Sequence, residues 1–282
     1  MSLVNMKVLL ENAEYDNYGV GAFSVANMEM IMGVIQAAQE LNSPAILQIA
    51  QVRLPYSPLH LIGPMMVAAA ERATVPIAVH FDHGTDLEAI KQALDLGFTS
   101  VMIDASHLPI EQNIDIVGKV KDLADRYHAA VEAEVGQLGG SEGNTEDLEM
   151  FYSDPLEVQK LYESTKVDAI ALSIGNIHGL YKNEPKLKFE LLSETRKLVS
   201  VPLVLHGGSG ISSEDFRKCI SMGIRKVNIA TANFTAVENS VRDYCSKDKK
   251  DFFQLSSQMV SGMQQNVIQH MNIFQSNNKA GR

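Results

Sequence analysis

The 282-residue chain has only two cysteines, Cys219 and Cys245, and no tryptophan. Two cysteines are too few for a disulfide framework or for a metal site built from thiolates, and this usage is typical of a reducing compartment. The sequence also lacks an apolar run long enough for a membrane-spanning helix, and no basic region followed by an apolar stretch marks a secretory segment. We therefore expect a cytoplasmic protein.

Positive charge is scarce as well. The chain has 24 Lys and Arg against 34 Asp and Glu, a formal net charge of −10. This balance argues against nucleic acid or an anionic membrane as a partner, so an anionic ligand must be held by a local cluster of donors. No linker rich in proline, glycine or serine divides the chain, and 45% of its residues are hydrophobic. These features predict one globular domain over residues 1–282.

Short apolar segments rich in β-branched residues recur eight times, and each is followed by a polar or glycine-containing break and a stretch with helical spacing. The predicted strands are 18–24, 44–50, 76–82, 100–106, 129–136, 169–175, 202–208 and 226–231. Amphipathic segments between them include 28–41, 86–96, 110–127 and 212–222. This alternation predicts an α/β fold, a (β/α)8 TIM barrel rather than an open sheet. Residues 252–274 are predicted to form an additional C-terminal helix, which we expect to cap the barrel or support oligomer contacts.

Three histidines stand at or just beyond predicted strand ends, each beside a glycine. His83 follows the third strand, His178 lies in the loop after the sixth, and His206 ends the seventh. Barrel enzymes place their chemistry at the carboxyl ends of the strands, so these side chains are expected to converge. Three neutral imidazoles leave one position open on a zinc ion, which is typical of a catalytic rather than a structural site. His60, His128 and His270 lie in helical or loop segments, where a structural role is the commoner one.

A glycine-rich loop follows His206 and leads into a segment, 211–214, that has the pattern of a serine-capped helix start. Backbone N–H groups beside a helix N-terminus attract a dianion, and the loops after strands 7 and 8 are the usual phosphate site of this fold. Residues 228–231, at the end of the eighth strand, are expected to add further donors.

Carboxylates accompany these histidines. Asp82 directly precedes His83, which suits a general acid/base acting beside a Lewis acid. Asp104 and Glu134 end the fourth and fifth strands and are predicted to orient the imidazoles, a role that His80 and His107 could share. The long glycine-rich stretch after the fifth strand has the composition of a lid, a binding loop or a disordered segment. If it closes over the site, Glu142 would bring a second acid/base with it.

At these residues the chain resembles the class II fructose-bisphosphate and tagatose-bisphosphate aldolases over nearly its whole length. The matching motifs are DHG at 82–84, VMIDAS at 101–106, EAEVG at 132–136 with the glycines at 139–140, HGLYK at 178–182, HGGSG at 206–210 and KVNIAT at 226–231.

The resemblance implies cleavage of a ketose bisphosphate into dihydroxyacetone phosphate and an aldehyde. It implies zinc on His83, His178 and His206, with Asp82 as the catalytic acid/base and Glu142 as the loop glutamate. It further implies a monovalent cation (Na⁺ or K⁺) near the phosphate and a homodimer or homotetramer, with no nucleic acid and no membrane as partners. The implied contacts to the dihydroxyacetone phosphate half are Gly179, Lys182, Gly207, Gly208, Ser209, Asn228, Ile229, Ala230 and Thr231.

Three positions, Ser24, Ala50 and Arg53, depart from the family's usual pattern. Ser24 stands where an asparagine is common, and Ala50 where many fructose-bisphosphate members have a serine for the distal phosphate. Ala230 is more similar to the tagatose-type members. An aldolase that uses an unphosphorylated or carboxylated aldehyde therefore stays open, with Arg53 meeting a carboxylate or phosphate.

Three other functions fit these motifs less well. A zinc hydrolase would have little use for a phosphate loop. A Schiff-base aldolase would need a lysine at a strand end facing the pocket, and the third to seventh predicted strands end without one. A non-catalytic sugar-phosphate binding protein would not need Asp82 and Glu142 beside three histidines.

Overall fold

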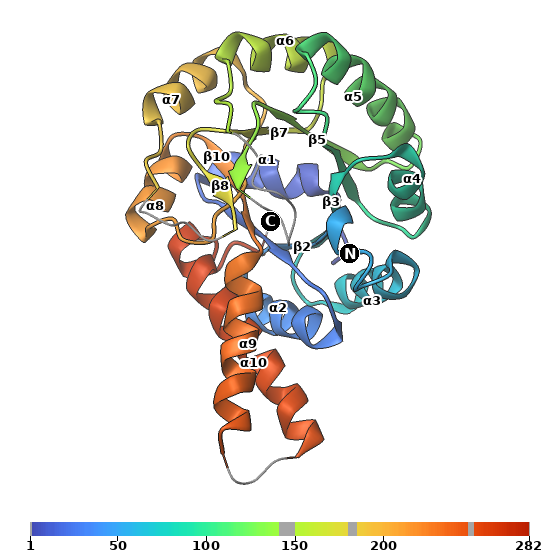
Figure 1. The fold of residues 1–282 in the computed structure, drawn as a ribbon, viewed down its shortest axis with the longest axis vertical. Coiled ribbons are helices and arrows are strands. Elements are labelled where there is room, and N and C mark those ends of the chain that lie inside the picture. Colours follow the sequence, from blue (N-terminus) through green and yellow to red (C-terminus); the bar gives the residue numbers. More distant parts are fainter. Residues whose placement is uncertain (1, 141–149, 180–184, 248–250, 282) are drawn as a thin grey trace.

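The computed structural model describes residues 2–140, 150–179, 185–247 and 251–281. Eight parallel strands close into a barrel in the order β1-β10-β9-β7-β5-β4-β3-β2 (Figure 1), which confirms the predicted TIM barrel and all eight predicted strands. The barrel strands are β1 Val20–Ser24, β2 Ala45–Ala50, β3 Ile77–Gly84, β4 Ser100–Ile103, β5 Ala130–Val135, β7 Ala169–Leu172, β9 Leu203–Leu205 and β10 Ile224–Ile229. Two short strands, β6 Gly139–Gly140 and β8 Ile177–His178, pair with each other outside the barrel.

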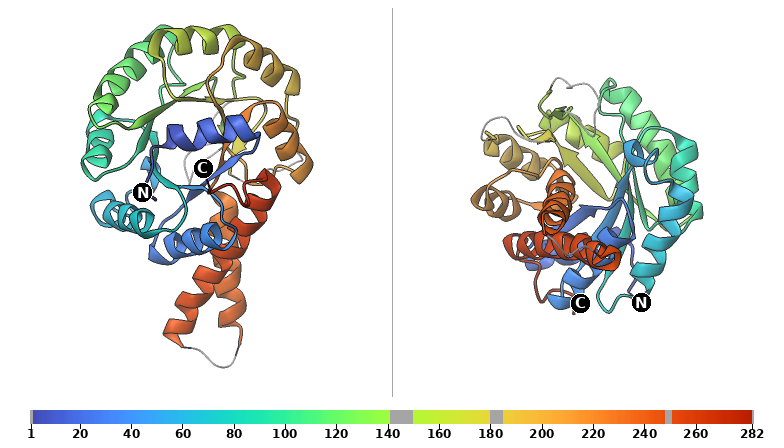
Figure 2. Two further views of the ribbon diagram at one scale, coloured as in Figure 1. Left: turned by 180° about the vertical axis from the view of Figure 1, so that it is seen from behind. Right: turned by 60° about the horizontal axis from the view of Figure 1, so that its bottom comes forward.

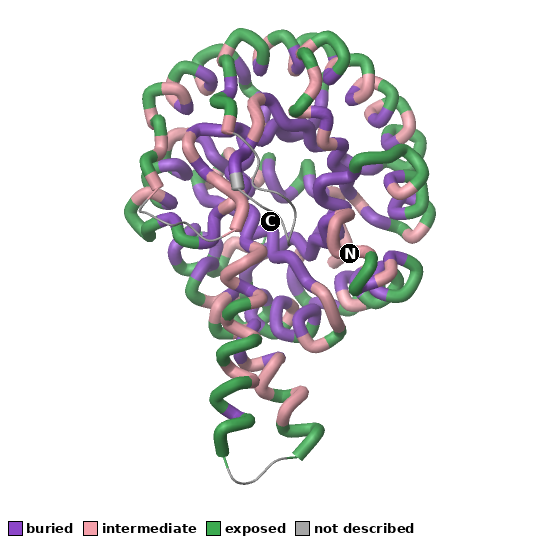
Figure 3. Tube along the Cα trace, viewed as in Figure 1, coloured by how far each residue is buried: buried purple, intermediate pink, exposed green. Residues whose placement is uncertain are grey.

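Helices surround the barrel and cover its outer face. Following the barrel strands along the chain they are α2 Met28–Glu40, α3 Leu59–Arg72, α4 Leu87–Asp95, α5 Ile110–Asp125, α6 Pro155–Thr165, α7 Phe189–Leu198, α8 Ser213–Ser221 and α9 Thr231–Cys245, with a 3-10 turn, η1, over Gln51–Arg53. Figure 3 shows that the strands and the inward helix faces are buried, while the outer helix faces are exposed. Burial of these apolar faces against the sheet is the main favourable contribution to folding.

The amino-terminal end of the barrel is closed by a helix that the sequence analysis did not identify, α1 Met6–Asp16. Seen from behind, α1 lies across the barrel opening (Figure 2). Met6, Leu9 and Leu10 are almost fully buried and pack against small side chains inside the barrel, including Ala22 and Ala78. Small residues on the strands leave the room that these larger helical side chains fill, so this end is apolar and sealed.

The other half of the barrel interior is polar. On β2, β3 and β5 the inward apolar residues are Ile46, Ala78 and Ala130. Two residues further along each strand, the next inward positions are Gln48, His80 and Glu132, which are all fully buried. Successive inward positions on a strand are two residues apart, so these side chains lie one layer above the apolar ones. The barrel therefore directs buried polar groups toward its carboxyl end.

The predicted C-terminal helix is present as α10 Phe252–Phe274. With α9 it projects beyond the barrel as a long hairpin, and its later turns lie beside α2 (Figures 1 and 2). Phe252 and Phe253, at the projecting end, are 75% and 77% exposed. Within the described part of the chain, no helix is both long enough and apolar enough to cross a membrane.

Candidate active site

The end of β3 presents two adjacent polar side chains to the same rim. Asp82 and His83 are both buried, and the pairing of β3 with β4 shifts register just beyond Phe81. His83 has a φ of 44°, in the left-handed region that few residues with a side chain adopt. Gly84 follows because a Cβ there would lie 2.6 Å from the Met102 carbonyl oxygen. This irregularity lets neighbouring residues both face the pocket, which a regular strand would not allow.

The three histidines predicted as metal ligands lie together. Their ring centroids are 4.7 Å apart for His83 and His206, 4.9 Å for His83 and His178, and 6.1 Å for His178 and His206. One nitrogen from each ring falls in a group whose members all lie within 4.8 Å of one another. Two ligands of one tetrahedral zinc ion lie roughly 3.3 Å apart, so these rings need only small adjustments to share a cation.

Hydrogen bonds on the far side of two rings determine which nitrogens are available. His83 Nδ1–H donates to Asp104 Oδ2 at 2.9 Å, and His206 Nε2–H donates to Glu132 Oε1 at 2.6 Å. The remaining nitrogens, His83 Nε2 and His206 Nδ1, then face each other at 2.9 Å with their lone pairs. A cation between them would relieve this repulsion, and a carboxylate behind each ring is the usual support for a histidine ligand.

The two glutamates of β5 have different surroundings. Glu132, which the sequence analysis did not select, holds His206, whereas the predicted Glu134 lies 3.4 Å from His206 Nδ1, on the side of the other histidines. Burial and the charge of Asp104 raise the pKa of Glu134 well above its usual value. Burial alone would also raise the pKa of Glu132, but Lys226 and the His206 hydrogen bond outweigh it and hold that pKa below the usual range.

Burial keeps the His178 and His206 imidazoles neutral. Burial, with a smaller contribution from His83, lowers the pKa of His178 to about 3. It also lowers the pKa of His206 to about 4, although Glu132 opposes the shift. Neutral imidazole is the form that binds a metal ion, so both rings are ready ligands at neutral pH.

The segment that carries His178 is held by a buried amide. Asn176 Nδ2 donates to the Leu172 carbonyl at 3.1 Å and to the His206 carbonyl at 3.0 Å, and its Oδ1 accepts from Ile174 N–H at 2.7 Å. Asn176 thereby ties the end of β7 to the end of β9. The pairing of β8 with β6 then places His178 over the rim.

An inner pocket lies beside the histidines. It is lined by Gln48, Arg53, Asp82, His83, His178, Gly179, Gly207, Ser209, Asn228, Ala230 and Thr231. Six of the predicted phosphate contacts are among them, but Gly208 and Ile229 are not. The Gly208 N–H donates instead to the Asn228 carbonyl at 3.1 Å, and the Ile229 side chain is fully buried in the core. Neither residue lines the inner pocket, and their contact with the phosphate stays a prediction.

The helix N-terminus at the inner pocket is that of α9. The expected serine cap of α8 exists, since Ser212 Oγ accepts from Asp215 N–H at 3.1 Å, but Ser212 is exposed and does not line the pocket. Instead Ala230 and Thr231, at the start of α9, line it. Ser209 Oγ accepts from Ala232 N–H at 2.9 Å, which leaves its own O–H to donate to a ligand.

Asp82 is held by two amide donors in the barrel interior. Gln48 Nε2 donates to Oδ2 and Asn228 Nδ2 to Oδ1, both at 3.1 Å. Lys226 lies beneath Asn228, with its ammonium 2.7 Å from Asn228 Oδ1 and 2.9 Å from Glu132 Oε2. The ammonium is fully buried in this ion pair and is not presented to the pocket as a Schiff-base lysine must be.

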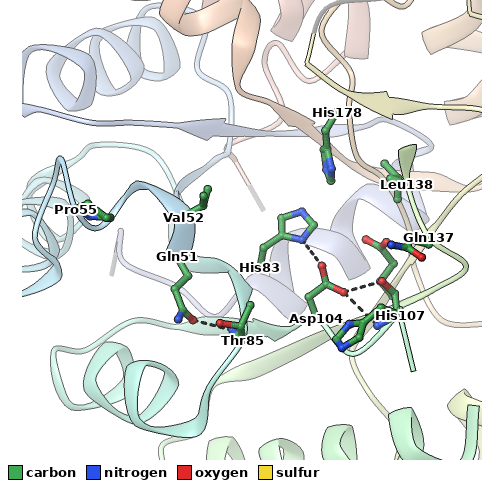
Figure 4. Close-up of a pocket in the computed structure, with 12 residues that line it drawn as sticks. Gln51, Val52, Pro55, His83, Thr85, Asp104, His107, Gln137, Leu138 and His178 are labelled. Atoms are coloured by element: carbon green, nitrogen blue, oxygen red, sulfur yellow. Dashed lines mark hydrogen bonds and ion pairs between the residues drawn. The ribbon is translucent and has the colours of Figure 1, made fainter. Parts of the chain in front are cut away.

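An outer cavity of about 620 Å³ opens on the other side of His83 and His178 (Figure 4). Asp104, Glu134 and His107 line it, together with Gln137 and Leu138. The two histidines line both spaces, so the inner pocket and the outer cavity adjoin each other at these rings.

Two predicted residues, Glu142 and Lys182, lie outside the residues that the structure describes. The three histidines expected to be structural lie away from the cluster. His60 and His128 are exposed, and His270 is buried, with its Nδ1 2.8 Å from the Asn266 carbonyl. His80 bonds to Ser100 Oγ at 2.9 Å and lies 3.7 Å from Asp82, deeper in the barrel than the three converging rings.

Comparisons with known proteins identify the family of the chain. The family model described as "Fructose-bisphosphate aldolase class-II" matches residues 4–279. A fructose-bisphosphate aldolase of Staphylococcus aureus is 41% identical over 253 residues, 89% of this chain and 88% of its own. One from Geobacillus stearothermophilus is 41% identical over 251 residues, 88% of each chain.

Solved structures match over almost the whole length. The YdjI aldolase of Escherichia coli K12 has a TM-score of 0.89 and 33% identity, covering 99% of both chains. A putative fructose-1,6-bisphosphate aldolase of Coccidioides immitis has a TM-score of 0.90 and 31% identity, covering 97% of this chain and 96% of its own. The chain belongs to the class II fructose-bisphosphate aldolase family.

Proposed function

We propose that this protein is a metal-dependent lyase that reversibly cleaves a ketose phosphate into dihydroxyacetone phosphate and an aldehyde, acting on a bisphosphate such as tagatose or fructose 1,6-bisphosphate. One observation carries the proposal: three imidazoles converge beside the Asp82 carboxylate, between a pocket lined by backbone donors and a larger cavity. A hydrolase or a binding protein would not require this combination.

The donor set fits zinc. We propose that His83, His178 and His206 hold the ion, with Asp104 and Glu132 orienting two of the rings. Imidazole suits zinc, and three protein ligands leave a position for substrate. Bound there, the ion would supply a Lewis acid that polarises the ketose carbonyl.

The chain's own residues would place the substrate and move its protons. The phosphate would lie in the inner pocket against Gly207, Ser209 and the start of α9. Asp82 would take the proton of the C4 hydroxyl as the C3–C4 bond breaks, while Gln48 and Asn228 keep its carboxylate oriented. We assign Glu142 the return of a proton to C3, as the family resemblance implies.

An aldehyde without a distal phosphate is a second candidate for the other half of the substrate. No residue described along the outer cavity carries a permanent positive charge, and Asp104 adds a carboxylate to its wall. Ala50 adds no hydroxyl where many relatives have a serine. A neutral aldehyde would meet less repulsion there than a phosphorylated or carboxylated one.

The test is a condensation screen. Dihydroxyacetone phosphate is offered with phosphorylated, carboxylated and neutral aldehydes, with and without a chelator. We expect activity that chelation abolishes and zinc restores, and the preferred aldehyde identifies the distal group. If no aldehyde is consumed with zinc present, the proposed function is wrong.

The Asp82→Ala variant tests the proton transfer. We expect kcat to fall by about 10²- to 10⁴-fold. The zinc content, measured by atomic absorption, should stay at the wild-type level because Asp82 is not among the converging ligands. Undiminished turnover would remove Asp82 from this role.

Three further attributes belong to the same proposal. They are a homodimer or homotetramer, a monovalent cation near the phosphate, and a cytoplasmic location. Sedimentation, activity in Na⁺ against K⁺ buffers, and cell fractionation test them in turn.

A further inference from the structure

Arg53 departs from the family pattern. Its position decides whether it faces the distal end of the substrate or the phosphate of the ketone half. It ends the η1 turn directly after β2 and is partly buried. It lines the inner pocket, with Gly207 and Ser209, whereas Gln51 and Val52 of the same turn line the outer cavity. Its side chain is therefore directed toward the proposed phosphate end of the substrate and away from the distal end.

An aromatic ring holds the guanidinium in place. The Arg53 Cζ atom lies 5.0 Å from the centroid of Phe234, which belongs to the first turn of α9. A guanidinium stacked on a ring keeps its N–H edge free for an anion, and stacking reduces the conformational entropy lost on binding. The same helix start contributes Ala230 and Thr231 to the pocket, so Arg53 and the backbone donors share one wall.

The charge of the pocket gives Arg53 its importance. The other described residues around the phosphate position offer neutral backbone and hydroxyl donors, and Asp82 adds a carboxylate. A phosphate monoester carries a charge of about −1.5 to −2 at neutral pH. Arg53 is the one permanent cation among the described lining residues, and no described carboxylate lies within ion-pair distance of it.

We propose that Arg53 is a specificity-determining residue that binds the phosphate of the ketone half and selects phosphorylated over unphosphorylated ketones. The inference rests on the proposed function for its reaction, but the binding step can be measured without turnover. In this proposal Arg53 binds the phosphate of the ketone half and not the distal carboxylate or phosphate that the sequence led us to expect.

The experiment compares wild type with Arg53→Gln, Arg53→Lys and Arg72→Gln. Arg72 ends α3 and is exposed, so its variant is matched in charge change but lies outside the lining of either space. Condensation is measured with dihydroxyacetone phosphate and with dihydroxyacetone, each against glyceraldehyde and glyceraldehyde 3-phosphate. Binding of glycerol 3-phosphate, which cannot react, is measured by calorimetry.

For Arg53→Gln we expect kcat/KM with dihydroxyacetone phosphate to fall roughly 10- to 100-fold, as for loss of a charge-assisted hydrogen bond. The rate with dihydroxyacetone should change less than about twofold, and glycerol 3-phosphate affinity should fall by the same factor as kcat/KM. For Arg53→Lys, kcat/KM and glycerol 3-phosphate affinity should lie between those of wild type and Arg53→Gln, because lysine keeps the charge but not the planar guanidinium. Arg72→Gln should match wild type.

Three results would overturn the inference: equal losses with both ketones, losses that follow the phosphate of the aldehyde instead, or unchanged glycerol 3-phosphate binding. Should Arg53→Gln fold poorly, Arg53→Lys and Phe234→Leu decide the question, the latter because it removes the ring that orients the guanidinium. Wild-type protein that binds glycerol 3-phosphate but condenses no aldehyde would refute the proposed reaction alone, and the binding series would still decide the role of Arg53.

Discussion

Replacement of Glu132 by glutamine tests the buried charge network under the proposed metal site. Glu132 and Lys226 have fully buried side chains 2.9 Å apart. In Glu132→Gln the amide oxygen can still accept from His206, but the amide N–H₂ meets the ammonium. Leaving one partner of a buried ion pair uncompensated costs about 3–5 kcal/mol. We expect that loss in unfolding free energy, with metal affinity reduced by only about 10-fold because His206 keeps an acceptor.

The assay is unfolding by urea in the presence of a chelator. Circular dichroism monitors the transition because the chain has no tryptophan. Adding Lys226→Met removes the orphaned charge, so the double variant should be more stable than Glu132→Gln by about 2 kcal/mol or more. Glu111→Gln is the matched control, since Glu111 pairs with Lys160 at the surface and should contribute little. A loss for Glu132→Gln no larger than for Glu111→Gln would refute the reasoning.

Two further predictions concern the same rim. Gly207→Ala should weaken metal binding and raise KM for the phosphorylated ketone. Gly207 has a φ of 61°, and a Cβ there would lie 2.1 Å from the Ile177 carbonyl oxygen and displace the strand that carries His178. Calorimetry with zinc measures the metal affinity and steady-state kinetics measure KM; unchanged values would contradict the close approach. The metal-free protein should also lose stability as pH falls. His178, with its pKa lowered to about 3, stays neutral when folded but is protonated when unfolded below about pH 6.5. Its contribution is fully present above pH 6.5 and declines by about 1.4 kcal/mol per pH unit down to the folded pKa. Urea unfolding at pH 6.5 and 5.0 should therefore show a shallower decline for His178→Asn than for wild type, and parallel declines would contradict the burial argument.

The choice between two helix N-termini shows where local sequence stops being informative. Both the loop before α8 and the end of β10 before α9 have the pattern of a phosphate site. The structure places Ala230 and Thr231 of α9 at the pocket and leaves the α8 cap at Ser212 exposed. The tilt and stagger of the closed barrel decide which helix start faces inward, and neither can be derived from the residues of one loop.

The sequence by itself determined the order of the barrel strands and the positions of the histidines, because alternating periodicity and polar strand ends are local patterns. It also contained a signal for the buried network, since Glu132 and Glu134, like Lys226 and Asn228, are two residues apart and so share a face of their strand. Only the tertiary structure decided their partners. Glu132 reaches His206 and Lys226 across the barrel, and the closure of the sheet, rather than the spacing along any strand, brings those groups within hydrogen-bonding distance.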